Sequence, residues 1–132
     1  MKRREAAKVS EKRYVVAIPI PSLDRSGKKL RKGRIKKWTR IIQRELSRCF
    51  GGATPIAAPG TNIVGNKLLF ERDQILVLSA CDDRREYLSR RSRVEKAARR
   101  MGIGLNQESV FVLAIASDSF LIEWPRDARR GL

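Results

Sequence analysis

The chain has 132 residues, 42% of them hydrophobic, which is enough for one domain with one core and too few for two ordinary domains. Its 30 lysines and arginines outnumber 14 aspartates and glutamates, so the net charge at pH 7 is +16. No apolar run approaches the roughly 18–20 residues of a membrane span, and the charged start lacks the apolar core of a signal peptide, so we expect a cytoplasmic protein without a membrane partner.

The first elements are a basic arm and a buried strand. Residues 1–13 are polar, basic and without periodicity, which predicts a flexible arm. The segment YVVAIPI, residues 14–20, is β-branched and almost wholly apolar, as in a strand buried on both faces. Pro19 and Pro21 end it because proline donates no ladder hydrogen bond. A loop with many cations follows.

Residues 34–50 form the clearest predicted helix. Apolar residues recur there at steps of three and four, which is the spacing of one helical face. Four cations share that spacing and therefore form a second stripe on another side of the helix: Lys37, Arg40, Arg44 and Arg48. Gly51 and Gly52 end the helix, where a left-handed residue is favoured.

The middle of the chain predicts short strands and a second helix. Residues 53–66 are rich in proline and glycine, which indicates a short strand followed by a turn or flap. Residues 67–81 supply one long strand or two pieces broken near Asp73. Asp82 starts the next helix, because acids are favoured at a helix amino terminus. Gly102 and Gly104 close it.

The last elements are two strands. Residues 109–116 predict a strand, 117–119 a hairpin turn, and 120–124 a final strand, before a loose basic tail at 125–132. A single domain thus spans residues 14–124. The order β-α-β-β-α-β with an additional C-terminal edge strand predicts an α+β fold, a two-layer ferredoxin-like sandwich.

Several phrases resemble a family of small bacterial and phage ferredoxin-like domains. The phrases are a helix ending in FGG (50–52), the Glu-led strand FERDQILVLSA, and LNQESVFVLAI (105–115) before the last core strand. The match covers about residues 14–124, and Asn106 departs from the glycine of that family. The resemblance implies the sandwich fold and assigns no catalytic residue.

Familiar catalytic sets are missing. The chain has no histidine, which excludes Ser-His and Cys-His pairs, and it lacks the spacing of a phosphate-binding loop. Cys49 and Cys81 lie far apart in apolar settings, which favours reduced core thiols over a metal pair. We therefore expect no catalytic residue, no metal and no cofactor.

The charge is uneven, and it leads to the main functional hypothesis. Residues 1–66 hold 17 of the Lys and Arg residues against 4 acids, and the remainder is nearly balanced. Such an excess usually reports a polyanionic partner, so we predict a non-enzymatic nucleic-acid-binding accessory domain of a larger nucleoprotein or defence/mobile-element assembly, in contact with RNA or DNA phosphates. The predicted contact residues are Lys28, Lys29, Arg31, Lys32, Arg34, Lys36, Lys37, Arg40, Arg44, Arg48, Arg90, Arg91, Arg93 and Arg99.

Two alternatives remain open at this point. One is a metal-dependent nuclease or phosphodiesterase that uses Asp24 with Glu71 or Asp82, since divalent cations prefer oxygen ligands. The other is a protein-interaction module whose edge strand, ending at Trp124, pairs with a protein partner or with a second copy as a homodimer.

Overall fold

The computed structural model of the chain describes residues 8–125. Its strands and helices follow the order β1 (Lys8–Ile20), α1 (Lys32–Phe50), β2 (Thr54–Ala57), β3 (Gly60–Val64), β4 (Lys67–Glu71), β5 (Ile75–Cys81), α2 (Arg84–Gly104) and β6 (Leu113–Glu123). With the β3–β4 hairpin set aside, this is the predicted β-α-β-β-α-β order. Within the described range, no helix is long and apolar enough to cross a membrane.

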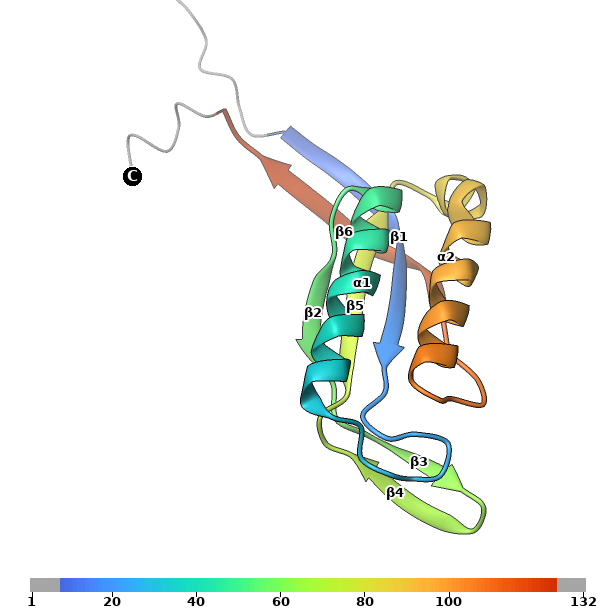
Figure 1. Cartoon of the computed structure of the whole chain (residues 1–132). Helices are drawn as coiled ribbons and strands as arrows, with labels where there is room; N and C mark the ends of the chain where they lie inside the picture. Colours follow the sequence, from blue (N-terminus) through green and yellow to red (C-terminus); the bar gives the residue numbers. More distant parts are fainter. Residues whose placement is uncertain (1–7, 126–132) are drawn as a thin grey trace, which may run out of the picture.

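The fold is a two-layer α+β sandwich. Four strands form an antiparallel sheet in the order β2-β5-β1-β6, and β3 pairs with β4 in a separate two-stranded sheet. Both helices lie side by side on one face of the larger sheet (Figure 1). This arrangement confirms the predicted α+β class and its two layers. The additional C-terminal edge strand is not confirmed, because the segment Leu113–Glu123 forms the single strand β6.

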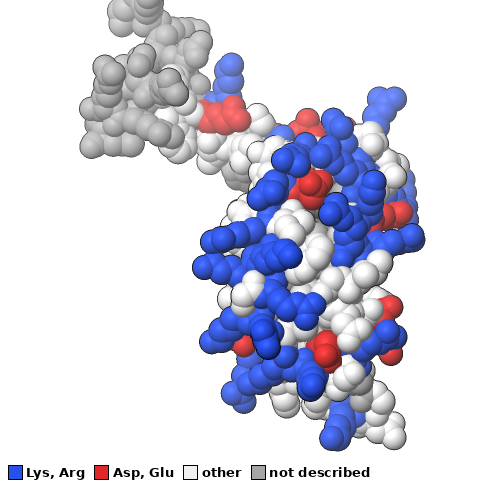
Figure 2. Space-filling view, in the orientation of Figure 1, with Lys and Arg blue, Asp and Glu red and all other residues white. Residues whose placement is uncertain are grey.

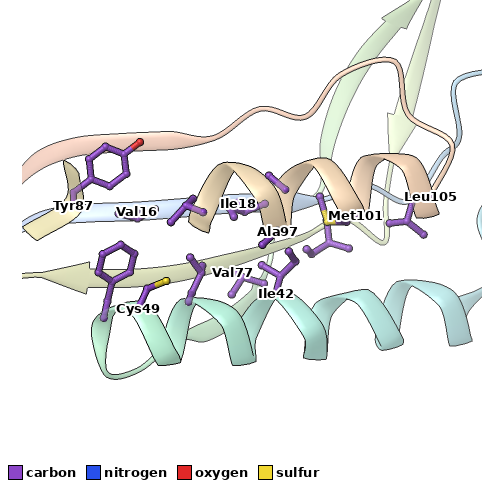
Figure 3. Packing of buried hydrophobic residues seen from close by; sticks show 14 of the residues in the cluster. Val16, Ile18, Ile42, Cys49, Val77, Tyr87, Ala97, Met101 and Leu105 are labelled. Carbon is purple, nitrogen blue, oxygen red and sulfur yellow. The ribbon is translucent and has the colours of Figure 1, made fainter. Parts of the chain in front are cut away.

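The core lies between the helices and the sheet. Alternate residues of β1 and β5 point toward the helices, and Val16, Ile18 and Val77 are fully buried there. Ile42 of α1 and Met101 of α2 close over them (Figure 3). The apolar stripe predicted for residues 34–50 is therefore the face that α1 buries, which leaves its cations facing solvent.

The ends of the two helices show which local sequence signals predicted a cap correctly. Gly51 follows α1 with φ 93° and its amide donates to the carbonyl of Ser47, so the predicted left-handed cap is confirmed. Asp83 caps α2, because its Oδ1 accepts the Glu86 amide at 2.9 Å. Gly104, predicted to end α2, lies in its last turn, where a Cβ atom would clash with the Trp38 ring.

The two chain ends differ from the expectation. Residues 8–13 of the predicted arm belong to β1, paired with β6; residues 1–7 and 126–132 lie outside the described residues. The predicted hairpin turn at 117–119 is instead a bulge within a continuous β6, where Ser117 and Asp118 oppose the single residue Arg13. The polar SDS phrase indicated a turn, but an antiparallel ladder continues past a bulge.

Candidate functional site

The candidate site is the turn of residues 22–25, which follows β1 directly. Ser22 is buried, its carbonyl accepts the amide of Leu30 shortly before α1, and its own amide bonds Glu71 at the end of β4. Two distant segments hold it: Glu71 at the end of β4 and Gln107 after α2. We call this group of residues, 22–25 with Glu71 and Gln107, the turn site.

Glu71 is a buried carboxylate fixed by backbone amides. Glu71 is only 7% exposed. Its Oε1 accepts the Ser22 amide at 3.1 Å and the Leu23 amide at 3.3 Å. No hydrogen bond reaches Oε2 from the part of the chain that the structure describes. A buried carboxylate with one oxygen available is a strong acceptor, because little water competes for it.

Ser22 contributes an unpartnered hydroxyl at the same place. Its Oγ is buried and has no hydrogen-bond partner among the residues between 8 and 125. Buried polar atoms are nearly always paired, and the exceptions often mark a ligand or a catalytic role. The hydroxyl and the available Glu71 oxygen therefore offer a donor and an acceptor within one turn.

Gln107 holds the other side of the turn. Its Nε2 donates to the carbonyl of Leu23 at 2.7 Å, while Asn106 accepts the Arg25 amide at 2.9 Å. Asn106 has φ 53°, the left-handed region, which asparagine tolerates better than most residues. Arg25 also lies 3.8 Å from the Glu108 carboxylate.

The structure separates Asp82 from the other residues of the predicted nuclease, whereas Asp24 and Glu71 both belong to the turn site. Asp24 caps its own loop, where Oδ1 accepts the amides of Ser26 and Lys28 at 2.8 and 3.0 Å. Asp82 follows β5, whereas Glu71 precedes it, so about 20 Å of strand lies between them. No group of three metal-ligating residues occurs in the described range. The predicted set of Asp24 with Asp82 is not assembled.

Two hollows involve residues of the turn site or their neighbours in sequence. One, of about 600 Å³, lies between α1 and the segment that follows Glu71, and is lined by Ile35, Thr39, Gln43 and Gln74 among others. The other, of about 350 Å³, lies between α2 and the segment that includes Gln107. Both are within the range of small-molecule sites.

The predicted contact cations are all exposed, and most belong to the helical layer. In Figure 2 lysines and arginines cover the helical face of the molecule. Some are paired with acids: Arg48 and Arg93 both approach Glu45, and Arg91 bonds Glu95 at 2.8 Å. The predicted clustering of cations is thus present, but clustering alone does not identify the ligand.

Both cysteines are free and buried, as expected for core thiols. Burial raises the pKa of Cys49, and it raises that of Cys81 to about 11. Neither thiol is therefore a ready nucleophile at neutral pH.

Comparison with known proteins shows that solved structures share this fold. No protein family and no curated protein matches the sequence. The chain is similar in structure to a phage S-adenosylmethionine lyase in complex with S-methyl-5′-thioadenosine, with a TM-score of 0.57, 13% identity and 95% of each chain covered. The same kind of lyase in its apo state gives a TM-score of 0.54, 13% identity and 96% of each chain.

This likeness overturns the functional hypothesis from charge. The proteins that share the fold act on a small sulfonium compound, and nothing in the comparisons supports nucleic-acid contact, so the prediction of a non-enzymatic nucleic-acid-binding accessory domain is wrong. The nuclease falls with it, whereas the edge-strand interaction module stays a prediction. The physical reason is that surface charge reports solubility and nonspecific association rather than the chemistry of a site.

Sequence reasoning found part of the turn site. Glu71 was singled out as a metal ligand, while Ser22 and Gln107 were not singled out as site residues. Their partners lie 49 and 84 positions away, at Glu71 and Leu23, so no local spacing reveals the contacts. The NQES phrase before the last strand was the one available signal.

Proposed function

We propose that the chain binds S-adenosylmethionine and cleaves it to S-methyl-5′-thioadenosine, in a ferredoxin-like sandwich with the reaction at the turn site. The observation that carries the proposal is the fold likeness over 95% of both chains to a lyase that holds this thioether. The buried Glu71 carboxylate and the unpartnered Ser22 hydroxyl support the location.

The proposed reaction breaks one carbon–sulfur bond. In S-adenosylmethionine a positively charged sulfur bonds the methyl group, the ribose C5′ and the methionine Cγ. Formation of the thioether breaks the bond from sulfur to Cγ, and the electron pair stays on sulfur. As that bond breaks, either the fragment's own carboxylate oxygen bonds Cγ and closes a lactone, or a base such as the Glu71 carboxylate takes a Cβ proton and an alkene forms between Cβ and Cγ. Both routes balance without water.

Glu71 suits such a substrate in two ways. A carboxylate accepts hydrogen bonds from ribose hydroxyls, and it is a counter-charge for a sulfonium in a water-poor site. The two backbone amides fix one oxygen in place, so the other is held in a defined direction. The neighbouring hollow of about 600 Å³ begins at Arg72 and is large enough for a nucleoside.

Charge near the turn site is mixed. Glu71 is a buried acid there, whereas Lys32, Lys36, Arg40 and Arg72 line the neighbouring hollow together with Asp73.

The test is incubation of the purified chain with S-adenosylmethionine and detection of products by liquid chromatography and mass spectrometry. We expect S-methyl-5′-thioadenosine, and the second product separates the lactone from the alkene route. Glu71→Gln keeps the shape but removes the charge, and we expect at least about a 100-fold loss of the rate constant.

Asp83→Asn is the matched control. It also neutralises an acid that accepts a backbone amide, it retains a good cap, and it lies at the opposite end of β5. We expect unchanged turnover for this variant. Absence of the thioether with the wild-type chain, or an equal loss in both variants, would contradict the proposal.

A further inference from the structure

A groove lies between the two helices on the solvent side of the helical layer. It has a volume of about 490 Å³ and is lined by side chains of both α1 and α2. Trp38 and Ile41 of α1 and Ala97 of α2 supply its apolar floor. Figure 2 shows uncharged surface between the cations of the two helices. We call this feature the interhelical groove.

The apolar floor is held in place before anything binds to it. A Cβ atom on Gly104 would lie 2.3 Å from a Trp38 ring carbon, so the ring packs directly against the backbone of α2. The Arg34 guanidinium of α1 also donates to the Gly104 carbonyl, which ties the two helices together at this end. A preformed surface loses little conformational entropy when a partner binds.

Cations border the interhelical groove on both sides. Those that line it from α2 are Arg90, Arg93, Lys96 and Arg100. Arg93 approaches the Glu45 carboxylate at 3.3 Å, whereas none of the other three forms an ion pair with an acid in the range 8–125. On α1, helical spacing places Lys37, Arg44 and Arg48 beside the lining residues. The groove therefore combines an apolar floor with two cationic borders.

This combination favours an acidic amphipathic helix over a phosphate backbone. Such a helix has an apolar stripe for the floor and acids on both sides of the stripe for the two borders, and a helix packs readily into a groove between two others. A phosphate backbone meets the cations but has no apolar side chain to cover Trp38 and Ile41. Because exposed ion pairs each contribute little, contact with the floor distinguishes the two ligands.

We propose that the interhelical groove binds an acidic amphipathic helix of a partner protein. The apolar side chains of that helix cover Trp38 and Ile41, and its carboxylates pair with Lys96 and Arg100. Glu45 repels a partner acid placed opposite it, so it restricts the register in which the helix can bind. This interaction goes beyond the proposed activity and does not depend on it.

Fluorescence anisotropy with a synthetic peptide tests the proposal. The labelled peptide has about 20 residues, with leucines at steps of three and four and glutamates elsewhere. We expect saturable binding to the full chain that weakens as salt rises, because salt screens the ion pairs. A peptide of the same composition with scrambled leucine positions has no apolar stripe, and we expect it to bind at least about tenfold more weakly.

Charge reversal in α2 locates the binding surface. Arg100→Glu and Lys96→Glu place a like charge beside the peptide acids, and we expect each variant to weaken binding at least about fivefold. Arg99→Glu is the matched control. It changes the net charge equally and adjoins Arg100, but Arg99 lines the hollow on the other side of α2, so we expect less than about a twofold change.

The indole signal of Trp38 in a nuclear magnetic resonance titration gives a second readout that needs no variant. We expect a saturable shift of this signal with the unlabelled peptide, while the indole signal of Trp124 stays in place. No binding of the striped peptide, equal binding of the scrambled peptide, or an equal loss in Arg99→Glu would overturn the proposal. A single-stranded oligonucleotide of the same net charge that binds as tightly, with the same dependence on Arg100, would also overturn it.

Discussion

The two ends of β5 both carry acids, but they use them differently. After β5, Asp82 and Asp83 are exposed. Asp83 accepts the Glu86 amide and Glu86 in turn accepts the Asp82 amide at 2.8 Å, while the Asp82 carboxylate pairs on the surface with Lys12 of β1. Before β5, Glu71 is buried and bonds amides almost fifty residues away. The first pattern is a local cap that many helices have, while the second fixes a distant turn and leaves one oxygen available.

The largest predicted effect is at the Glu71 end. Glu71→Ala removes the acceptor of the Ser22 and Leu23 amides. The Ser22 amide is buried, and a buried amide without a partner lowers the free energy of unfolding. We expect the free energy of unfolding, measured by urea denaturation, to fall by about 3 kcal/mol. Glu71→Gln keeps an acceptor, so its loss should be clearly smaller; equal losses would mean that the carboxylate only fills space.

Close packing at the same end predicts the next effect. A Cβ atom on Gly104 would lie 2.3 Å from a Trp38 ring carbon, so Gly104→Ala should destabilise the fold by about 2 kcal/mol. Trp38→Leu in the same chain should relieve the clash and recover part of the loss in the same urea assay. Gly33→Ala is the control, since nothing lies within 4 Å of its added Cβ, and a loss there as large as at Gly104 would refute the packing argument.

A smaller effect is expected at the Asp82 end. Asp83→Ala removes the cap of α2, and we expect a loss of about 1 kcal/mol in thermal or urea unfolding. Asp83→Asn should be nearly neutral because asparagine is an equally good cap. A loss at Asp83 that exceeded the loss at Glu71 would reverse the comparison between the two ends.

At neutral pH the smallest effect concerns Cys81, beside the same cap. Burial raises the pKa of its thiol to about 11, above the ordinary value of 9.0. Below pH 9 the thiol is protonated in both states and does not affect stability. Between pH 9 and 11 the unfolded chain loses this proton while the folded chain keeps it, so stability falls as pH rises. The decline in unfolding free energy over this interval should be shallower in Cys81→Ala, and an identical slope would argue against the raised pKa.

The comparison also shows what sequence could and could not provide. The apolar spacing of residues 34–50, the left-handed Gly51 and the acids at 82–83 act over a few residues, so the helices and their caps were predictable. The bulge at Ser117 was not, because a polar tripeptide suits a turn and a bulge equally. The partners of Glu71 were hidden for a different reason, since only the folded sheet brings the end of β4 to the turn after β1.

Charge was the least informative part of the sequence about function. The cations on α1 and α2 are placed as their spacing predicted, on the solvent side of the helices (Figure 2). Their position follows from amphipathic packing, which would arise with many different ligands or with none. The buried polar groups of the turn site are costly to maintain, and they are therefore the better guide.

The most direct test of the account is a nuclear magnetic resonance titration of the chain with S-methyl-5′-thioadenosine. We predict that the backbone amide signals of Ser22, Leu23 and Glu71 shift in a saturable way, while those of residues 82–86 stay in place. No saturable shift, or shifts confined to residues 82–86 or to the cationic faces of the helices, would contradict the placement of the reaction at the turn site.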